Sequence, residues 1–211
     1  MAADNRNPIT FYTADTPNGL KVGIYLHEAG LAHQRHPVDL GAGEQKRPEY
    51  LKINPNGKIP AIVDHEAGLT VFESGAILSY LSNKSGHLQP DTLAGQLAVQ
   101  QWLHFQIGGI GPMLGQLWWF LHGSKSGNEE AIERYRKESL RLLGVVDRRL
   151  AESRHLATPD YSIADIAASS WLRSAEELQL DIAPFAHVDR WLKAIEARPA
   201  VQAAVRENEG G

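Results

Sequence analysis

A chain of 211 residues with 43% hydrophobic and 22% charged residues can bury a core in one large domain or two modest ones, which excludes extensive disorder. Its formal net charge of -4 argues against nucleic acid or an anionic membrane as the main partner. No apolar run reaches the roughly 20 residues of a membrane span, and MAADNRNPIT lacks the features of a signal peptide, so we expect a cytoplasmic protein.

The first part of the chain alternates strand-like and helical patterns. The strand-like segments are residues 9–12, 33–40, 61–65 and 69–72. The helical segments are residues 16–30, 47–55 and 74–86, with Ser74 predicted as an N-cap. Pro37 favours an edge position for the second strand because proline has no N–H to donate to a neighbouring strand. The predicted order is β-α-β-α-β-β-α.

From Leu93 onward the patterns are helical only. Candidate helices cover residues 94–122, 129–153, 163–178 and 186–197. The SIAD stretch from Ser162 to Asp165 predicts a capping box at a helix start. We therefore expect an α/β domain at residues 1–86, a linker at 87–93 and an all-helical domain at 94–211.

Two features of the α/β half are compatible with a bound amino-acid derivative. Pro60 cannot donate to a sheet, so the backbone of Ile59 could pair with an extended peptide, although Pro60 can equally be a loop proline. The free N–H groups near Ser74 favour a carboxylate, and Glu73 would face an amine beside it. Plain helix capping explains the Glu-Ser pair as well.

The stretch TPNG, Thr16 to Gly19, opens the first predicted helix. Thr16 suits the N-cap and Pro17 the first turn. A hydroxyl and an amide at a helix start can stabilise an anion such as a thiolate, although a well-capped helix is the simpler reading. The chain has no cysteine, which excludes a Cys-x-x-Cys redox pair, so any thiol chemistry must use a thiol that the protein binds.

The order of these features resembles the glutathione transferase superfamily. Its members have a thioredoxin-like domain, with an Ile–cis-Pro before the third strand and an acidic–Ser pair at the third helix, followed by an all-α domain. The resemblance covers nearly the whole chain and is carried by NPNGKIPAIVDH, FESGAILSYL, TPNG, QIGGIGPMLGQ and AIERY. These stretches are similar to the bacterial Nu-class transferases, which include glutathione-dependent disulfide-bond oxidoreductases and resemble the yeast prion nitrogen regulator.

The resemblance implies a site for glutathione as co-substrate. Its catalytic residues would be Thr16 and Asn18, which would donate hydrogen bonds to the glutathione sulfur. The binding residues would be Ile59 and Pro60 at the cysteinyl part, Glu73 and Ser74 at the γ-glutamyl part, Gln45 and Lys58 near the glycyl carboxylate, and Arg134 near the glutamyl carboxylate, within one chain or across a dimer interface.

The implied activity is disulfide reduction by bound glutathione, with transferase or peroxidase activity as a further capacity and a small disulfide or electrophile as second substrate. A homodimer is implied as well. The alternative is a non-catalytic glutathione-binding regulatory or interaction module of the same fold. Tyr12 is a rival thiol activator, although a strand tyrosine is more often packed.

Other features remain open or disfavoured. Nine histidines form no HExxH or similar motif, and His33 and His36 are expected on opposite faces of a strand, so no metal is expected. Trp118 and Trp119 could line a pocket for the second substrate, or they could pack in the core or at a dimer contact.

Overall fold

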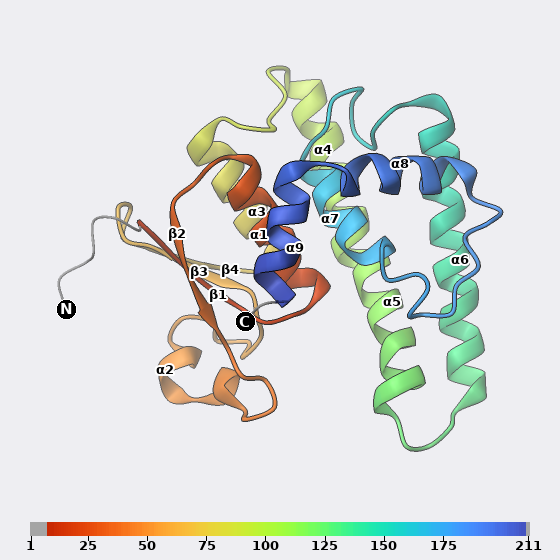
Figure 1. Cartoon of the computed structure of the whole chain (residues 1–211), viewed down its shortest axis with the longest axis horizontal. Coiled ribbons are helices and arrows are strands. Elements are labelled where there is room, and N and C mark those ends of the chain that lie inside the picture. The colour runs from red at the N-terminus through yellow and green to blue at the C-terminus, as the bar shows by residue number, and fades with distance from the viewer. Residues whose placement is uncertain (1–7, 210–211) are drawn as a thin grey trace. The chain divides into compact units, whose positions relative to one another are not determined.

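The computed structural model describes residues 8–209, which form two compact units. The sheet unit contains the chain up to His87 together with the segment from Arg198 onward, and the helical unit contains Leu88–Ala197. Figure 1 shows the strands in the first of these and the long helices of the second. The α/β and all-helical parts of the predicted fold are both confirmed.

The sheet has four strands in the order β2-β1-β3-β4. Their bounds are β1 Ile9–Thr13, β2 His33–Pro37, β3 Ala61–Asp64 and β4 Leu69–Phe72. Strand β1 pairs with β2 in parallel and with β3 antiparallel, and β3 pairs with β4 antiparallel. The edge position predicted for the strand of Pro37 is confirmed, because β2 lies at one end of the sheet.

The helices of the sheet unit are α1 Pro17–Glu28, the 3-10 turn η1 Glu44–Lys46, α2 Pro48–Leu51, α3 Ser74–Ser85 and α9 Pro199–Glu209. Helix α1 packs against both α3 and α9 (Figure 1). Its central turns, from Leu20 to Leu26, are buried throughout, so α1 is the centre of this unit.

The start of α3 differs from the prediction. Ser74 is the first residue of the helix, and the N-cap is Glu73, not Ser74. Glu73 has a φ of 71°, a conformation that residues other than glycine rarely adopt. The sharp turn that this φ creates turns the chain from β4 into α3 one residue earlier than the sequence indicated. The predicted stop at Gly86 is confirmed by its left-handed backbone.

Helix α9 was not predicted from the sequence. It begins at Pro199 and packs on α1, where Arg198 donates two hydrogen bonds to Glu28, at 2.6 and 2.9 Å. The predicted domains at residues 1–86 and 94–211 stay a prediction. Helix α9 itself belongs to the same compact unit as the sheet.

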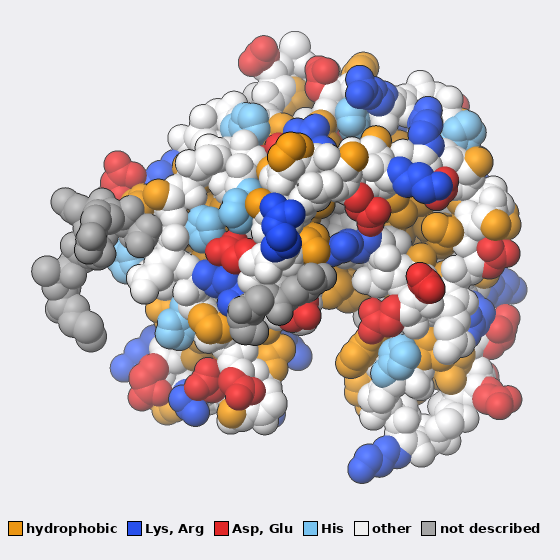
Figure 2. All heavy atoms as spheres, in the orientation of Figure 1, with side chains coloured by type: hydrophobic (Ala, Val, Ile, Leu, Met, Phe, Trp, Pro, Cys, Tyr) orange, Lys and Arg blue, Asp and Glu red, His pale blue; other side chains and the backbone are white. Residues whose placement is uncertain are grey.

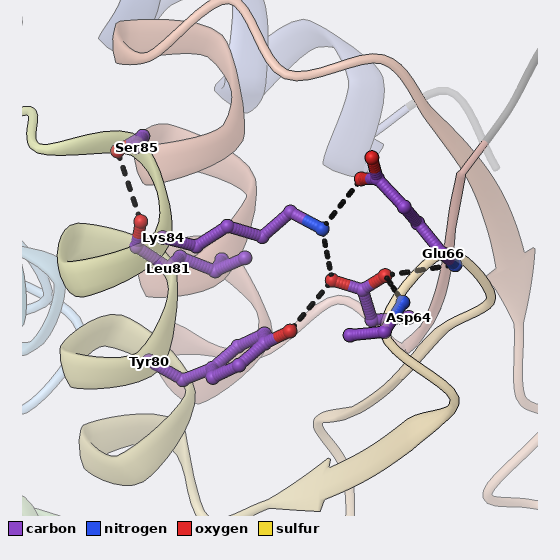
Figure 3. A network of polar contacts seen from close by, with 7 residues as sticks. Asp64, Glu66, Tyr80, Leu81, Lys84 and Ser85 are labelled. Carbon is purple, nitrogen blue, oxygen red and sulfur yellow. Dashed lines mark hydrogen bonds and ion pairs between the residues drawn. The ribbon is translucent and has the colours of Figure 1, made fainter.

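A polar network joins the end of β3 to α3 (Figure 3). The fully buried carboxylate of Asp64 accepts hydrogen bonds from Lys84 at 2.6 Å and from Tyr80 at 2.7 Å. It also accepts the backbone N–H groups of Glu66 and Ala67 in the β3–β4 turn. One side chain therefore fixes both the hairpin turn and the helix behind it.

The helical unit contains α4 Leu93–Phe105, α5 Gly111–Trp118, α6 Glu129–Glu152, α7 Ile163–Leu172 and α8 Ala186–Glu196. The predicted helix at 94–122 is interrupted by π-helical turns at Gln106–Ile110 and Trp119–Gly123, and the one predicted at 163–178 ends early, at Leu172. The capping box of Ser162 and Asp165 is confirmed, and Trp191 donates to the same carboxylate at 3.0 Å.

The surface is charged and mixed. Lys and Arg side chains are interspersed with Asp and Glu side chains on the face shown in Figure 2. Among residues 8–209, no helix is both long and apolar enough to cross a membrane.

Candidate functional site

The turn from β1 to α1 places Thr16 and Asn18 at the helix start. Thr16 is the N-cap, and its Oγ1 accepts the N–H of Gly19 at 3.1 Å, so its own O–H remains able to donate to a ligand. Asn18 is the second residue of the helix and is half-buried. The predicted cap and the predicted first-turn proline are both confirmed.

Gly19 lets this helix begin close to the strand. A Cβ at residue 19 would lie 2.3 Å from the Oγ1 of Thr13 and 2.6 Å from the carbonyl oxygen of Ala14. No side chain fits at that separation. The helix start is therefore held against the end of β1, where its free N–H groups favour an anion.

The rival activator Tyr12 is engaged in packing. Its ring centroid lies 4.7 Å from that of His36 and 5.9 Å from that of Tyr50. Burial raises the pKa of Tyr50 to about 12, with the neighbouring Tyr12 adding to the effect. These contacts favour the packing interpretation of Tyr12.

Ile59 and Pro60 lie beside the same turn. The Ile59–Pro60 peptide bond is cis, as the resemblance implied. The ladder between β1 and β3 ends at the pair Tyr12–Ala61, so it stops before Ile59. Strand β3 begins directly after Pro60, so the cis bond lies at the end of the ladder where β1 leads into the turn before α1.

The backbone of Gln45 lies close to Gly57, the residue before Lys58. The carbonyl oxygen of Lys58 accepts hydrogen bonds from Tyr50 and Asn54, both at 2.7 Å, while its side chain is exposed. A Cβ added at residue 57 would lie 3.1 Å from the carbonyl oxygen of Gln45. The Oε1 of Gln45 is buried without a hydrogen-bond partner among the described residues.

Sequence reasoning missed Lys21, which lies beside the predicted γ-glutamyl residues. This lysine is 1% exposed, and its Nζ donates to the Oγ of Ser74 at 3.1 Å. Burial lowers the pKa of Lys21 to about 7, and the carboxylate of Glu73 opposes that shift. The available signal was a lysine within the apolar run LKVGIYL, where a charged residue is unexpected.

The remaining predicted residues lie in the helical unit. Arg134 is exposed on α6, and Trp118 and Trp119 are exposed at the end of α5 and the turn that follows. Trp118 donates its indole N–H to Glu177 at 2.7 Å. The core-packing alternative for these two tryptophans is wrong because both rings are exposed. The roles of Arg134 and of the site residues of the sheet unit stay predictions.

Three ionisable side chains meet away from this turn. His27 of α1, His33 of β2 and Glu207 of α9 have ligand atoms within 4.8 Å of one another, and among residues 8–209 this is the only such group of three. His33 and His36 do lie on opposite faces of β2, since they pack against Phe11 and Tyr12 respectively. The partners of His33 come instead from α1 and α9.

Comparison with known proteins agrees with this arrangement. The family model for the glutathione S-transferase N-terminal domain matches residues 7–83, and the model for the C-terminal domain matches residues 110–199. The disulfide-bond oxidoreductase YfcG of Escherichia coli is 44% identical over 208 residues, which cover 96% of this chain and 97% of that protein.

Two solved structures are also similar. A glutathione transferase from Burkholderia graminis with two glutathione molecules bound per subunit has a TM-score of 0.93 and 43% identity, covering 100% of this chain and 92% of that one. A glutathione transferase from Pseudomonas putida with one glutathione disulfide bound per subunit has a TM-score of 0.91 and 41% identity, covering 97% and 93%. The chain therefore belongs to the glutathione S-transferase family.

Proposed function

We propose that this protein is a glutathione-dependent disulfide reductase, with glutathione transferase or peroxidase activity as a further capacity. The observation that carries the proposal is the start of α1, where Thr16 and Asn18 offer side-chain donors in a chain that has no cysteine. A sulfur bound there must come from the ligand. The name of the similar E. coli protein and the glutathione disulfide in the P. putida structure support the same chemistry.

In this proposal the sheet unit binds one glutathione at the residues where β3, α1 and α3 begin. Thr16 and Asn18 donate to the sulfur, and the backbone of Ile59 pairs with the cysteinyl part. Glu73 and Ser74 hold the γ-glutamyl amine and carboxylate. Gln45 and Lys58 lie near the glycyl carboxylate, which would give the buried Oε1 of Gln45 a partner through the glycyl N–H.

The reaction is thiol–disulfide exchange between ligands. The thiolate of the bound glutathione attacks one sulfur of the substrate disulfide, forming a mixed disulfide and releasing the other sulfur as a thiolate that takes up a proton. A second glutathione thiolate then attacks the glutathione sulfur of the mixed disulfide. The products are glutathione disulfide and two substrate thiols, so two glutathiones are oxidised for each disulfide reduced.

The protein's contribution is to raise the thiolate fraction. A free thiol with a pKa of about 8.5 is mostly protonated at neutral pH. Two side-chain donors and the N-terminal N–H groups of α1 favour the anion, which lowers the pKa of the bound thiol. No step of this scheme requires a metal.

Several finer features belong to the same proposal. The similarity to YfcG supports a place in the Nu class, whose members the sequence resembles. We expect a cytoplasmic homodimer, with Arg134 approaching the glutamyl carboxylate within one chain or across the dimer interface. The second substrate is a small disulfide or electrophile.

The test is a steady-state assay with two substrates side by side. Reduction of bis(2-hydroxyethyl) disulfide by glutathione is followed through glutathione disulfide formation, and conjugation of an aryl chloride is followed by absorbance. We expect disulfide reduction to dominate, with two glutathiones consumed per disulfide. Faster conjugation than reduction would contradict the reductase assignment.

The alternative is a glutathione-binding module without catalysis. It predicts that glutathione binds in a titration while both assays stay at the uncatalysed rate. The donors of Thr16 and Asn18 disfavour it, since a module that only binds the tripeptide gains nothing from groups directed at its sulfur.

A further inference from the structure

A buried lysine lies directly behind the predicted γ-glutamyl residues. We propose that Lys21 is a positioning residue for the ligand's α-carboxylate: it fixes the hydroxyl of Ser74 and takes up a proton when that carboxylate binds. The proposal rests on the proposed glutathione site and adds to it a group that does not touch the ligand.

The hydrogen bond between Lys21 and Ser74 has one direction while the lysine is protonated. A protonated lysine has donors only, so the Oγ of Ser74 accepts from the Nζ of Lys21 at 3.1 Å. The O–H of Ser74 is then left to donate elsewhere. Because Ser74 is the first residue of α3, its hydroxyl lies among the free N–H groups of that helix, and a carboxylate there would accept from all of them.

The charges around Lys21 explain why the ligand would change its protonation. Glu73 is the acidic group that acts on it, and burial opposes its charged form. Three other charged groups of α1 and α3 have partners elsewhere: His27 contacts Glu207, Glu28 contacts Arg198, and Lys84 contacts Asp64. Arg206 of α9 is exposed. A ligand carboxylate at Ser74 adds a second negative charge, which favours the ammonium form.

Binding of a γ-glutamyl carboxylate should therefore be coupled to proton uptake near neutral pH. The lysine pKa of about 7 in the free protein makes part of the population neutral at pH 7.5. A carboxylate at Ser74 would raise that pKa, so the neutral lysines would take up a proton when the ligand binds.

The test is calorimetric titration of the full chain with S-methylglutathione, which has no ionisable thiol. Titrations at pH 7.5 in buffers of different ionisation enthalpy count the protons exchanged. We expect net uptake by the wild type. Lys21→Met should abolish the uptake and weaken binding about tenfold or more, while Lys52→Met, which neutralises an exposed lysine, should change neither.

Two further measurements test the inference even if Lys21→Met does not fold correctly. N-Acetyl-S-methylcysteinylglycine lacks the γ-glutamyl part and has no group that titrates near neutral pH, so its binding to the wild type should show no uptake. In a double-mutant cycle, Lys21→Met and Ser74→Ala should be less than additive because both remove one interaction. Wild-type binding without proton uptake, or Lys21→Met binding like the wild type, would overturn the inference, whereas absence of any glutathione binding would overturn the proposed function itself.

A second inference rests on the independent cluster of His27, His33 and Glu207. We infer that these side chains form a divalent transition-metal site, of the kind Zn²⁺ occupies, which secures α9 to α1 and β2. The Nε2 of His27 lies 2.9 Å from one oxygen of Glu207, and the Nε2 of His33 lies 3.5 Å from the other. Ligand bonds of about 2.0–2.1 Å in tetrahedral geometry separate the ligand atoms by roughly 3.4 Å, close to these distances.

The ring orientation also suits a metal. The Nδ1–H of His33 donates to the carbonyl oxygen of Leu31 at 2.9 Å, so its Nε2 is the ring nitrogen directed at Glu207. A backbone acceptor on the far ring nitrogen is the usual support of a metal-ligating histidine. With all three ligands partly exposed, water would complete the coordination.

The test uses the full chain, cleared of metal with a chelator and free of glutathione. We expect one Zn²⁺ to bind per chain in a calorimetric titration and the melting temperature to rise. Glu207→Gln and His33→Asn should each remove the stoichiometric binding, while His104→Asn, at an exposed histidine of α4, should keep it. Absence of stoichiometric binding by the wild type, or binding unchanged in Glu207→Gln, would overturn the inference.

Discussion

Two side chains at the start of α1 are expected to control the reactivity of the bound sulfur. Thr16 caps the helix and Asn18 lies in its first turn, where backbone N–H groups already favour negative charge. Tyr12 is earlier, on β1, with its ring against His36 and Tyr50. We therefore expect Thr16 and Asn18 to activate the thiol and Tyr12 to serve packing.

Asn18→Ala should lower turnover by about tenfold to a hundredfold and move the pH at which activity appears upward, because the thiolate loses a donor while the protonated thiol loses little. The matched control is Tyr12→Phe, which removes only a hydroxyl and should stay within a few-fold of the wild type. Profiles of kcat against pH decide between them. A shift in the Tyr12→Phe profile alone would make this a tyrosine-type transferase.

Glu73 carries backbone strain at a proposed binding position. Its φ of 71° costs a side-chain-bearing residue roughly 1–3 kcal/mol, and glycine avoids most of that cost. We therefore expect Glu73→Gly to be more stable than Glu73→Ala by about 1 kcal/mol in denaturant unfolding. Both variants should bind glutathione more weakly than the wild type because both lose the carboxylate. Equal stability of the two would show that the turn carries no strain.

At the scale of elements, Asp64 connects β3, the hairpin turn and α3 (Figure 3). Burial by itself raises the pKa of Asp64, but hydrogen bonds from Lys84, Ala67 and Tyr80 outweigh it and hold the pKa below its usual value. A carboxyl group whose pKa is lower in the folded protein than in the unfolded chain stabilises the fold above the unfolded value of about 3.9. That stabilisation is lost as the pH falls through the folded pKa.

Asp64→Asn should therefore reduce the free energy of unfolding at pH 7 by about 2–4 kcal/mol, since Lys84 keeps its charge without its buried partner. The difference from the wild type should shrink as the pH falls below 4. Urea unfolding between pH 3 and pH 7 measures both. The control is Glu66→Gln at an exposed partner of Lys84, which should cost less than about 1 kcal/mol. A difference that does not change with pH would show that Asp64 acts by packing alone.

At the scale of the whole molecule, we expect a homodimer. Strand β4 lies at an edge of the sheet and exposes Leu69 and Phe72, and α4 exposes Leu93 and Leu97 on successive turns. Large exposed side chains of this kind commonly mark a surface that another chain covers. In a homodimer, Arg134 of one chain could approach the glutamyl carboxylate of glutathione bound to the partner chain.

Sedimentation at micromolar concentration should give twice the 23.3 kDa mass of one chain. Leu97→Glu, which introduces a charge on the exposed face of α4, should shift the equilibrium toward the monomer, whereas Gln101→Glu, one turn further on, should have a smaller effect because it replaces a polar side chain. A wild-type monomer with full activity would contradict the prediction.

Local sequence patterns were enough to predict the order of strands and helices from β1 to α3, the cap at Thr16, the edge strand of Pro37 and the capping box of Ser162. Each depends on residues close together in the chain, where backbone preferences and short-range hydrogen bonds decide the outcome. The motifs around Pro60 and Ser74 were recognisable for the same reason. Local patterns also misled, since Ser74 reads as a cap although the backbone of Glu73 takes that position.

Contacts between residues distant in sequence could not be predicted from these local patterns. Lys21 donates to Ser74 across 53 positions, Lys84 reaches Asp64 across 20, and His27 meets Glu207 across 180. Helix α9 has an ordinary amphipathic pattern, and nothing in that pattern specifies α1 as its partner. Burial of a charged group and the choice of its partner are set by packing between elements, which no window of neighbouring residues contains.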